Sequence, residues 1–230
     1  MPHNLRKSSD VLYPEKTKTD RQLMTFSYVD LTAIVTPIPP DWSGVAEPQK
    51  GPPKKAAVQL LLAGPLDRLE ILLTRRSDNL RLHAGQVSFP GGKPEADDDS
   101  PAMTAARECE EETGLSRQLI THLGYLEPVL TSTNYLVDQV VGYSAQDPRQ
   151  LDALLQPDPA EVDRTWFTPL NPLLNIDAYE RSERLSADGR LSWFWQIQDT
   201  KPMIWGATAQ MLRNLALSLN TRLRKDMDRL

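Results

Sequence analysis

Apolar residues fall in short runs separated by polar or proline-containing turns, and their spacing predicts strands and helices in mixed order. The runs AAVQLLLAG and LEILLTRRS, residues 56–64 and 69–77, predict a β-hairpin. Strands are also predicted over residues 25–36, 85–89, 121–129 and 135–145, and WFTPL at residues 166–170 begins another short element. A second hairpin is predicted over residues 184–198, turning at Asp188 and Gly189.

The order of these elements indicates the fold class. Residues 206–225 carry one apolar face at helical spacing, which predicts a long helix packed on the core. Because strands and helices are mixed and most strands are neighbours in sequence, we expect an α/β sandwich, a mixed β-sheet with helices on both faces. A proline-rich connection at residues 37–55 and a loop at residues 145–159 should lack regular structure. We expect one domain over residues 25–230 after a polar arm at residues 1–24.

The segment GGKPEADDDSPAMTAARECEEETGL, residues 91–115, contains a helix with clear end signals. Ser100 is a suitable N-cap, Pro101 fits the first helical position, and Gly114 fits a left-handed C-cap. The double glycine at Gly91 and Gly92 allows close approach of the backbone before the helix begins. The sequence therefore predicts a helix that starts at residue 101 and ends near residue 113.

Three carboxylates lie on one side of this predicted helix. Glu108 and Glu112 are four residues apart, and Glu111 is three residues from Glu108. Like charges at this spacing repel one another, so the arrangement favours a bound cation. Mg²⁺ takes oxygen ligands and is commonly shared between carboxylates and substrate phosphates. Arg107 lies four residues before Glu111 and can hold that carboxylate in position.

This segment resembles the Nudix box, which reads Gly, five residues, Glu, seven residues, Arg-Glu, a bulky apolar residue, any residue, Glu-Glu, any residue and Gly. The second half is matched by Arg107, Glu108, Glu111, Glu112 and Gly114, followed by the apolar Leu115. The first half departs from the pattern, because Asp99 stands in place of the glutamate and six residues separate it from Gly92. Cys109 also replaces the usual larger apolar residue.

The stretch just upstream, residues 72–92, is similar to an additional signature of the coenzyme A pyrophosphatase branch of Nudix hydrolases. The matching residues are Leu72, Leu73, Thr74, Arg76, Ser77, Arg81, Gly85, Phe89, Pro90, Gly91 and Gly92. The C-terminal stretch IWGATAQMLRNLAL is similar to the last helix of bacterial members. The resemblance covers residues 56–225 and is most specific over residues 72–115.

The resemblance implies a Nudix α/β/α sandwich and hydrolysis dependent on Mg²⁺ or Mn²⁺. It further implies cleavage of the coenzyme A diphosphate into 3′,5′-ADP and 4′-phosphopantetheine. We expect Glu108, Glu112 and Glu111 as metal ligands, with Asp99 either joining them or only placing negative charge before the helix. Arg107, Glu108, Glu111 and Glu161 are the predicted catalytic residues, Glu161 because many Nudix folds bring a loop carboxylate toward the metal from this region.

Substrate binding is assigned to a second set of residues. Arg76 and Arg81 offer guanidinium groups suited to phosphate oxygens, and Gly91 and Gly92 offer backbone. His83 either assists phosphate binding or is structural. The aromatic residues of the C-terminal hairpin and its surroundings either stack on adenine, line a pantetheine channel or pack in the core; these are Trp193, Phe194, Trp195 and Trp205.

Composition narrows the possible classes of protein and of binding partner. A net charge of −5 argues against a nucleic-acid binder, and no apolar run is long enough to span a membrane. The single cysteine, Cys109, excludes an internal disulfide and favours the cytosol. The expected partner is a small molecule, coenzyme A or a related nucleotide, and a homodimer is left open. So are a Nudix hydrolase for ADP-ribose, a dinucleotide or a nucleoside triphosphate, and a non-catalytic nucleotide-binding domain. Spacing alone does not identify the general base.

Overall fold

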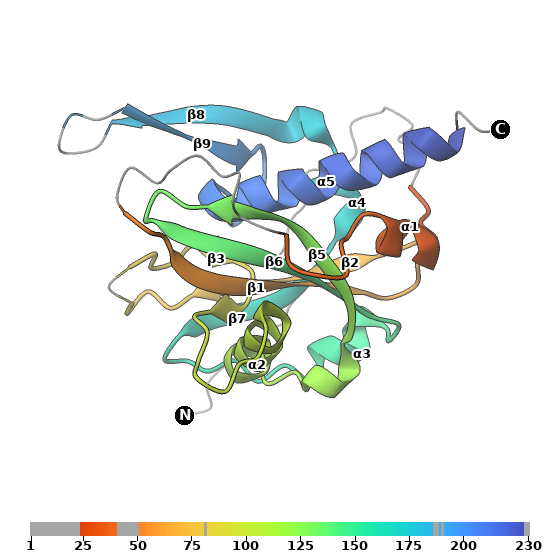
Figure 1. Cartoon of the computed structure of the whole chain (residues 1–230), viewed down its shortest axis with the longest axis horizontal. Helices are drawn as coiled ribbons and strands as arrows, with labels where there is room; N and C mark the ends of the chain where they lie inside the picture. The colour runs from red at the N-terminus through yellow and green to blue at the C-terminus, as the bar shows by residue number, and fades with distance from the viewer. Residues whose placement is uncertain (1–23, 41–50, 81, 186–188, 190, 228–230) are drawn as a thin grey trace, which may run out of the picture.

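The computed structural model describes residues 24–40, 51–80, 82–185, 189 and 191–227 (Figure 1). The helices are α1 (Tyr28–Ala33), α2 (Pro101–Thr113), α3 (Pro148–Asp152), α4 (Leu170–Leu173) and α5 (Gly206–Met227), with short 3₁₀ turns at Arg117–Leu119 and Ile176–Ala178. The strands are β1 (Lys54–Ala63), β2 (Glu70–Arg76), β3 (Val87–Ser88), β4 (Gly91–Gly92), β5 (Thr121–Leu130), β6 (Tyr135–Ser144), β7 (Val162–Pro169), β8 (Tyr179–Leu185) and β9 (Leu191–Ile197).

A mixed seven-stranded sheet forms the centre of the molecule. Its main path is β3-β2-β1-β6-β5, while β4 pairs with β1 and β7 pairs with β2. Strands β1 and β6 are parallel from Lys54 opposite Tyr135 to Ala63 opposite Ser144, and every other pair in this sheet is antiparallel. The apolar runs of β1 and β6 suit this central position, because a strand covered on both faces reads as nearly continuous hydrophobic sequence.

Helices cover both faces of the sheet, which confirms the predicted α/β sandwich. Helix α5 lies on one face together with α1, and α2 lies on the other (Figure 1). Leu212, Leu215 and Leu219 join α5 to the larger core cluster. On the opposite face, Ala105 of α2 packs with Ala57 and Val140 of the sheet. No described helix combines the length and the hydrophobicity needed to cross a bilayer.

Several strand and helix predictions are confirmed. The β1–β2 hairpin forms with Leu62 opposite Ile71, and β5 and β6 occupy the predicted stretches. The C-terminal hairpin forms between β8 and β9, although Asp188 at its predicted turn lies outside the described residues. The predicted polar arm likewise falls outside them, except for Met24.

The predicted strand at residues 25–36 is wrong, because its centre is the helix α1. Ser27 Oγ accepts the Asp30 N–H at 3.1 Å, and the Asp30 carboxylate accepts the Ser27 N–H at 2.9 Å. This reciprocal capping box satisfies donors at the start of the helix and outweighs the strand-like composition. The loop predicted at residues 145–159 likewise contains the short helix α3.

Two leucines of α5 offer a test of the packing. Leu212 is 1% exposed against the sheet, whereas Leu217 is 38% exposed. We expect Leu212→Ala to lower the free energy of unfolding by about 2–5 kcal/mol, because it leaves a cavity in the core. Leu217→Ala should change it far less. Urea denaturation of both variants measures the difference, and equal losses would contradict the assigned packing of α5.

Candidate active site

Helix α2 begins and ends at the residues that the sequence predicts. Ser100 Oγ accepts the Met103 N–H at 3.3 Å, and Pro101 occupies the first turn. Gly114 adopts φ 74°, and its N–H donates to the Glu110 carbonyl at 2.8 Å. A glycine reaches this left-handed conformation without a Cβ penalty. The caps fix the ends of the helix that carries the predicted carboxylates.

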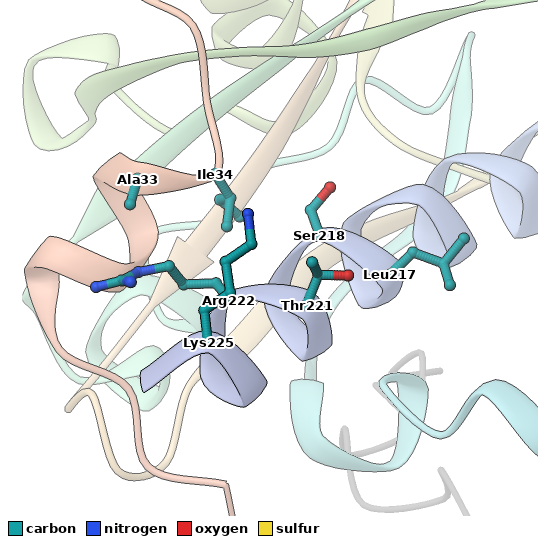
Figure 2. A pocket seen from close by; sticks show the side chains of 7 residues that line it. All are labelled: Ala33, Ile34, Leu217, Ser218, Thr221, Arg222 and Lys225. Carbon is teal, nitrogen blue, oxygen red and sulfur yellow. The ribbon is translucent and has the colours of Figure 1, made fainter. Parts of the chain in front are cut away.

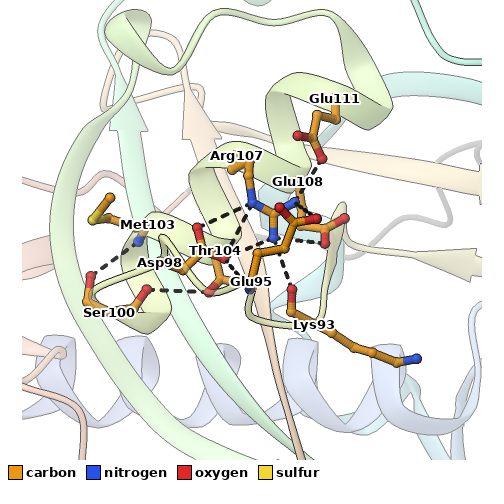
Figure 3. Close-up of polar contacts among 9 residues, drawn as sticks. All are labelled: Lys93, Glu95, Asp98, Ser100, Met103, Thr104, Arg107, Glu108 and Glu111. Carbon is orange, nitrogen blue, oxygen red and sulfur yellow. Dashed lines mark hydrogen bonds and ion pairs between the residues drawn. The ribbon is translucent and has the colours of Figure 1, made fainter.

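Arg107 connects α2 to the loop before it (Figure 3). Its guanidinium donates to Asp98 at 2.9 Å, to Glu111 at 2.8 Å and to Glu108 at 3.2 Å. It also donates to the Lys93 carbonyl at 3.0 Å. The hydrogen bonds from Arg107 lower the pKa of Asp98 to about 2, and Asp98 in turn raises the pKa of Arg107. Arg107 therefore fixes the loop and orients Glu111, as predicted, and it also contacts Glu108.

Glu108, Glu112 and Glu161 form a group of neighbouring acids, called the carboxylate cluster below. Burial raises the pKa of Glu112 to about 8, opposed by the Gly91 N–H and by Arg76 and reinforced by the charges of Glu108 and Glu161. Burial also raises the pKa of Glu108, and the charge of Glu161 adds to this increase. Glu161 lies in the loop before β7, and its carbonyl accepts the Ser77 N–H at 2.8 Å. The structure thus brings the predicted loop carboxylate to the helix.

The two glycines of β4 permit this close arrangement. A Cβ on Gly91 would lie 2.3 Å from the Ala57 carbonyl oxygen of β1. A Cβ on Gly92 would lie 2.4 Å from the carboxyl carbon of Glu108. The Gly91 N–H also donates to Glu112 at 3.2 Å. Any larger residue at Gly92 would displace Glu108, so the sheet edge and the helix are matched to each other.

The glycine pair of β4 lies beside a helix that carries an Arg-Glu pair and a Glu-Glu pair. This arrangement agrees with a comparison against known families. A family model of the NUDIX domain matches residues 53–188, which hold α2 and the whole carboxylate cluster. The chain belongs to the Nudix family. Its Nudix relatives are hydrolases, and this Nudix protein is accordingly a pyrophosphohydrolase.

Curated relatives share sequence over most of the chain. Nudix hydrolase 15, mitochondrial, of Arabidopsis thaliana is 35% identical over 205 residues, covering 86% of this chain and 68% of the relative. The uncharacterized Nudix hydrolase NudL of Photorhabdus laumondii is 40% identical over 148 residues, covering 64% of this chain and 75% of the relative. Nudix hydrolase 22, chloroplastic, of A. thaliana is 39% identical over 165 residues, covering 70% of this chain and 53% of the relative. None of these names specifies a substrate.

Nudix hydrolases generally use divalent metal ions, and the donor set of this Nudix domain fits one. Carboxylate oxygens are the ligands that hard cations such as Mg²⁺ prefer. Glu112 is buried and Glu108 is partly buried, and the pKa of each is raised, so a nearby dication would relieve both desolvation and repulsion. Within the described part of the chain, no three His, Cys, Asp or Glu side chains already stand close enough to hold an ion.

The two expected roles of Asp99 are a metal ligand and a negative charge that lies before the helix. The Asp99 side chain is exposed on the loop, and Asp98 takes the position beside Arg107. Counting forward from Gly92, five residues precede Asp98, so this residue keeps the spacing of the Nudix box from the glycine side. The one residue by which this segment exceeds the Nudix box therefore lies between Asp98 and Arg107. Asp99 keeps the seven-residue spacing to Arg107, whereas Asp98 keeps the five-residue spacing to Gly92, so spacing alone does not choose between the two aspartates.

The predicted phosphate-binding residues have different environments. Arg76, at the end of β2, lies 3.7 Å from Glu112 and is part of the site. Arg81 lies outside the described residues. His83 is exposed at φ 60°, and its Nδ1 lies 2.9 Å from the Gln86 side-chain oxygen, which supports the structural reading of this histidine.

The aromatic residues of the C-terminal hairpin pack on the α5 side of the molecule. The Arg213 guanidinium of α5 lies over the Trp195 ring, 4.3 Å from its centroid. The rings of Phe194 and Trp205 meet edge-to-face, with their centroids 5.3 Å apart. Packing is therefore the supported reading for these three residues. Trp193 is 51% exposed. Cys109 is fully buried and burial raises its pKa to about 12, so it is not a nucleophile.

A separate cavity lies between α1 and α5 (Figure 2). Its volume is about 310 Å³, and Arg222 and Lys225 stand at one end of it. Arg222 also forms an ion pair with Asp30 of α1 at 3.2 Å. Because α1 and α5 lie on the sheet face opposite α2, this cavity is not part of the carboxylate cluster (Figure 1).

The pKa of Glu112 gives a test of the site in the metal-free protein. In the folded protein this pKa is raised from 4.5 to about 8, so the folded state retains a proton that the unfolded chain releases. Unfolding free energy should therefore fall as pH rises through this window. Glu112→Gln removes the titration and should gain stability relative to wild type, on the order of a few kcal/mol at the alkaline end.

Denaturant unfolding of both proteins across the same pH range, in the presence of a chelator, measures this difference. Glu110→Gln is the matched control, because Glu110 lies on the same helix but pairs with Arg117 at 2.9 Å. Parallel stability curves for wild type and Glu112→Gln would show that Glu112 does not carry the raised pKa.

Proposed function

We propose that this Nudix hydrolase cleaves the diphosphate bond of coenzyme A or its derivatives, giving 3′,5′-ADP and 4′-phosphopantetheine. The observation that carries this proposal concerns residues 72–92, which resemble the signature of the coenzyme A pyrophosphatase branch. This same segment brings Arg76 and the Gly91 N–H to the buried Glu112 carboxylate. The resemblance therefore lies in a part of the chain that contacts the candidate active site.

Most residues of this segment support the fold, so only a few of them are left to contact a substrate. Leu72, Leu73 and Phe89 are buried, and the Thr74 hydroxyl bonds Ser88 at the β2–β3 pair. Gly85 adopts φ 69° in the connection between these strands. Arg76 remains partly exposed beside the carboxylate cluster, where its guanidinium can bind an oxygen of the substrate diphosphate. Arg81 is proposed as a second phosphate-binding residue on the basis of the sequence alone.

The carboxylates have distinct proposed roles. Glu108 and Glu112 would hold a Mg²⁺ or Mn²⁺ ion, with Glu111 as a further ligand. Asp99 is left out because Asp98, not Asp99, is joined to Arg107 of the site. The ion, when bound, neutralises phosphate oxygens and lowers the pKa of water. Arg107 orients Glu111 and Glu108 through its hydrogen bonds. The general base is the carboxylate among Glu108, Glu111 and Glu161 that is left free to take a proton from the attacking water.

Product analysis tests the substrate. Purified protein should convert coenzyme A with Mg²⁺ or Mn²⁺ into 3′,5′-ADP and 4′-phosphopantetheine, because cleavage falls on the diphosphate. Chromatography with mass detection identifies both products, and a chelator should abolish their formation. ADP-ribose and a dinucleotide serve as competing substrates under the same conditions. A decisive preference for either of them would refute the coenzyme A assignment while leaving the Nudix chemistry intact.

A pair of glutamines tests the metal site. Glu108→Gln should lower turnover by about 100-fold or more, because it removes a charged ligand or base from the cluster. Glu110→Gln should retain wild-type turnover, since Glu110 faces Arg117 instead. Both variants should fold, as judged by circular dichroism. Full activity of Glu108→Gln with Mg²⁺ would exclude Glu108 from the chemistry.

A further inference from the structure

Strands β8 and β9 form a two-stranded sheet of their own beside the main sheet. Helix α5 packs on β9, and β8 lies on the outer side of the hairpin (Figure 1). Among the described strands, only β9 pairs with β8. Within the described part of the chain the outer edge of β8 is unpaired, and an edge of this kind is a template for pairing with another chain.

The direction of the backbone groups along β8 follows from the hydrogen bonds at its base. The Gln198 N–H donates to the Ala178 carbonyl at 2.9 Å, whereas the Ile197 N–H points the other way, to the Ile204 carbonyl at 2.9 Å. Hydrogen-bonded and non-bonded pairs alternate along an antiparallel ladder. Continuing this alternation, the backbone of Ser182, opposite Phe194, faces β9, and the backbones of Arg181 and Glu183 face outward.

The side-chain charges along this edge are complementary to those of the same segment running in the opposite direction. Residues 180–184 read Glu-Arg-Ser-Glu-Arg, which places opposite charges at equal distances on either side of Ser182. If two copies pair antiparallel about Ser182, each Arg181 stands opposite Glu183 of the second copy. Each Glu180 likewise stands opposite Arg184 of the second copy. Arg181 and Glu183 are also the residues whose backbone groups face outward, so charge and main-chain hydrogen bonding select the same register.

We propose that two copies of this chain pair through the outer edges of β8 and form a continuous four-stranded sheet, β9-β8-β8-β9, across a two-fold axis at Ser182. A two-fold interface requires a self-complementary surface, and residues 180–184 supply one. Opposite charges directly across an antiparallel pair are stabilising, and like charges there are destabilising. Edge strands that avoid pairing also carry charged residues, most often lysine, or a proline, whereas the charges of this edge alternate in sign in a self-complementary order.

Aromatic residues flank the proposed charge pairs on one face of the hairpin. The Arg181 guanidinium lies 4.2 Å from the Trp193 ring, and Trp193 meets Trp195 edge-to-face at 6.1 Å. Arg181 stands opposite Trp195 and Glu183 opposite Trp193 within the hairpin. In the pair of copies, each charge pair would therefore lie between two tryptophans. This setting supplies apolar contact area in addition to the backbone bonds.

Charge reversal tests the register. Arg181→Glu places a carboxylate opposite Glu183 of the second copy, and Glu183→Arg places a guanidinium opposite Arg181, so each single variant replaces two attractions with two repulsions. We expect each to weaken dimerisation by about tenfold or more. The double variant restores self-complementarity and should dimerise. An equimolar mixture of the two single variants should also form a dimer, because the two carboxylates of one variant then face the two guanidinium groups of the other.

Analytical ultracentrifugation over a range of concentrations measures the mass against the 25.9 kDa of one chain. Circular dichroism and melting temperature confirm that each variant is folded. A dimer for wild type, the double variant and the mixture, with single variants that dimerise at least about tenfold more weakly, supports the proposal. A wild-type monomer at every concentration, single variants that dimerise as strongly as wild type, or a double variant or mixture that dimerises as weakly as the single variants would overturn it.

Discussion

The burial of the Glu112 carboxylate is the constraint on which the rest of the site depends. A carboxyl group with little access to water requires compensating partners. Gly91 and Arg76 supply them from β4 and the end of β2. These partners are useful only if α2 lies close to the sheet, and the glycines of β4 allow that distance. Glu112 is thus held where its negative charge is poorly solvated, which favours binding of a cation.

Pairing in the sheet brings distant parts of the chain to this one place. Strand β2 pairs with β7, which places the loop carrying Glu161 beside the end of β2. Strand β1 pairs with β4, which places Gly92 under Glu108. The loop before α2 is then fastened by Arg107 to Asp98. Each contact joins segments that are separated along the chain, so the site exists only in the folded domain.

Local patterns made much of the fold predictable. The caps of α2, the β1–β2 hairpin and the apolar face of α5 each depend on neighbouring residues, and the structure contains all of them. The missed helix α1 also had a local signal, because Ser27 and Asp30 stand at capping-box spacing. The parallel pairing of β1 with β6 and the contact of Arg76 with Glu112 could not be read from the sequence, since they depend on the order of strands in the sheet. The exchange of Asp98 for Asp99 depends on the course of a loop, which spacing does not determine.

The full burial of Cys109 matters for an enzyme whose proposed substrate and product both carry a thiol. Disulfide exchange requires a thiolate that another sulfur can reach. The one cysteine of this chain is fully buried and stays protonated near neutral pH, with a pKa of about 12. Neither pantetheine nor an oxidised coenzyme A could form a mixed disulfide with the folded protein. Neither the reduced nor the oxidised form of such a molecule would therefore be trapped covalently on the folded protein.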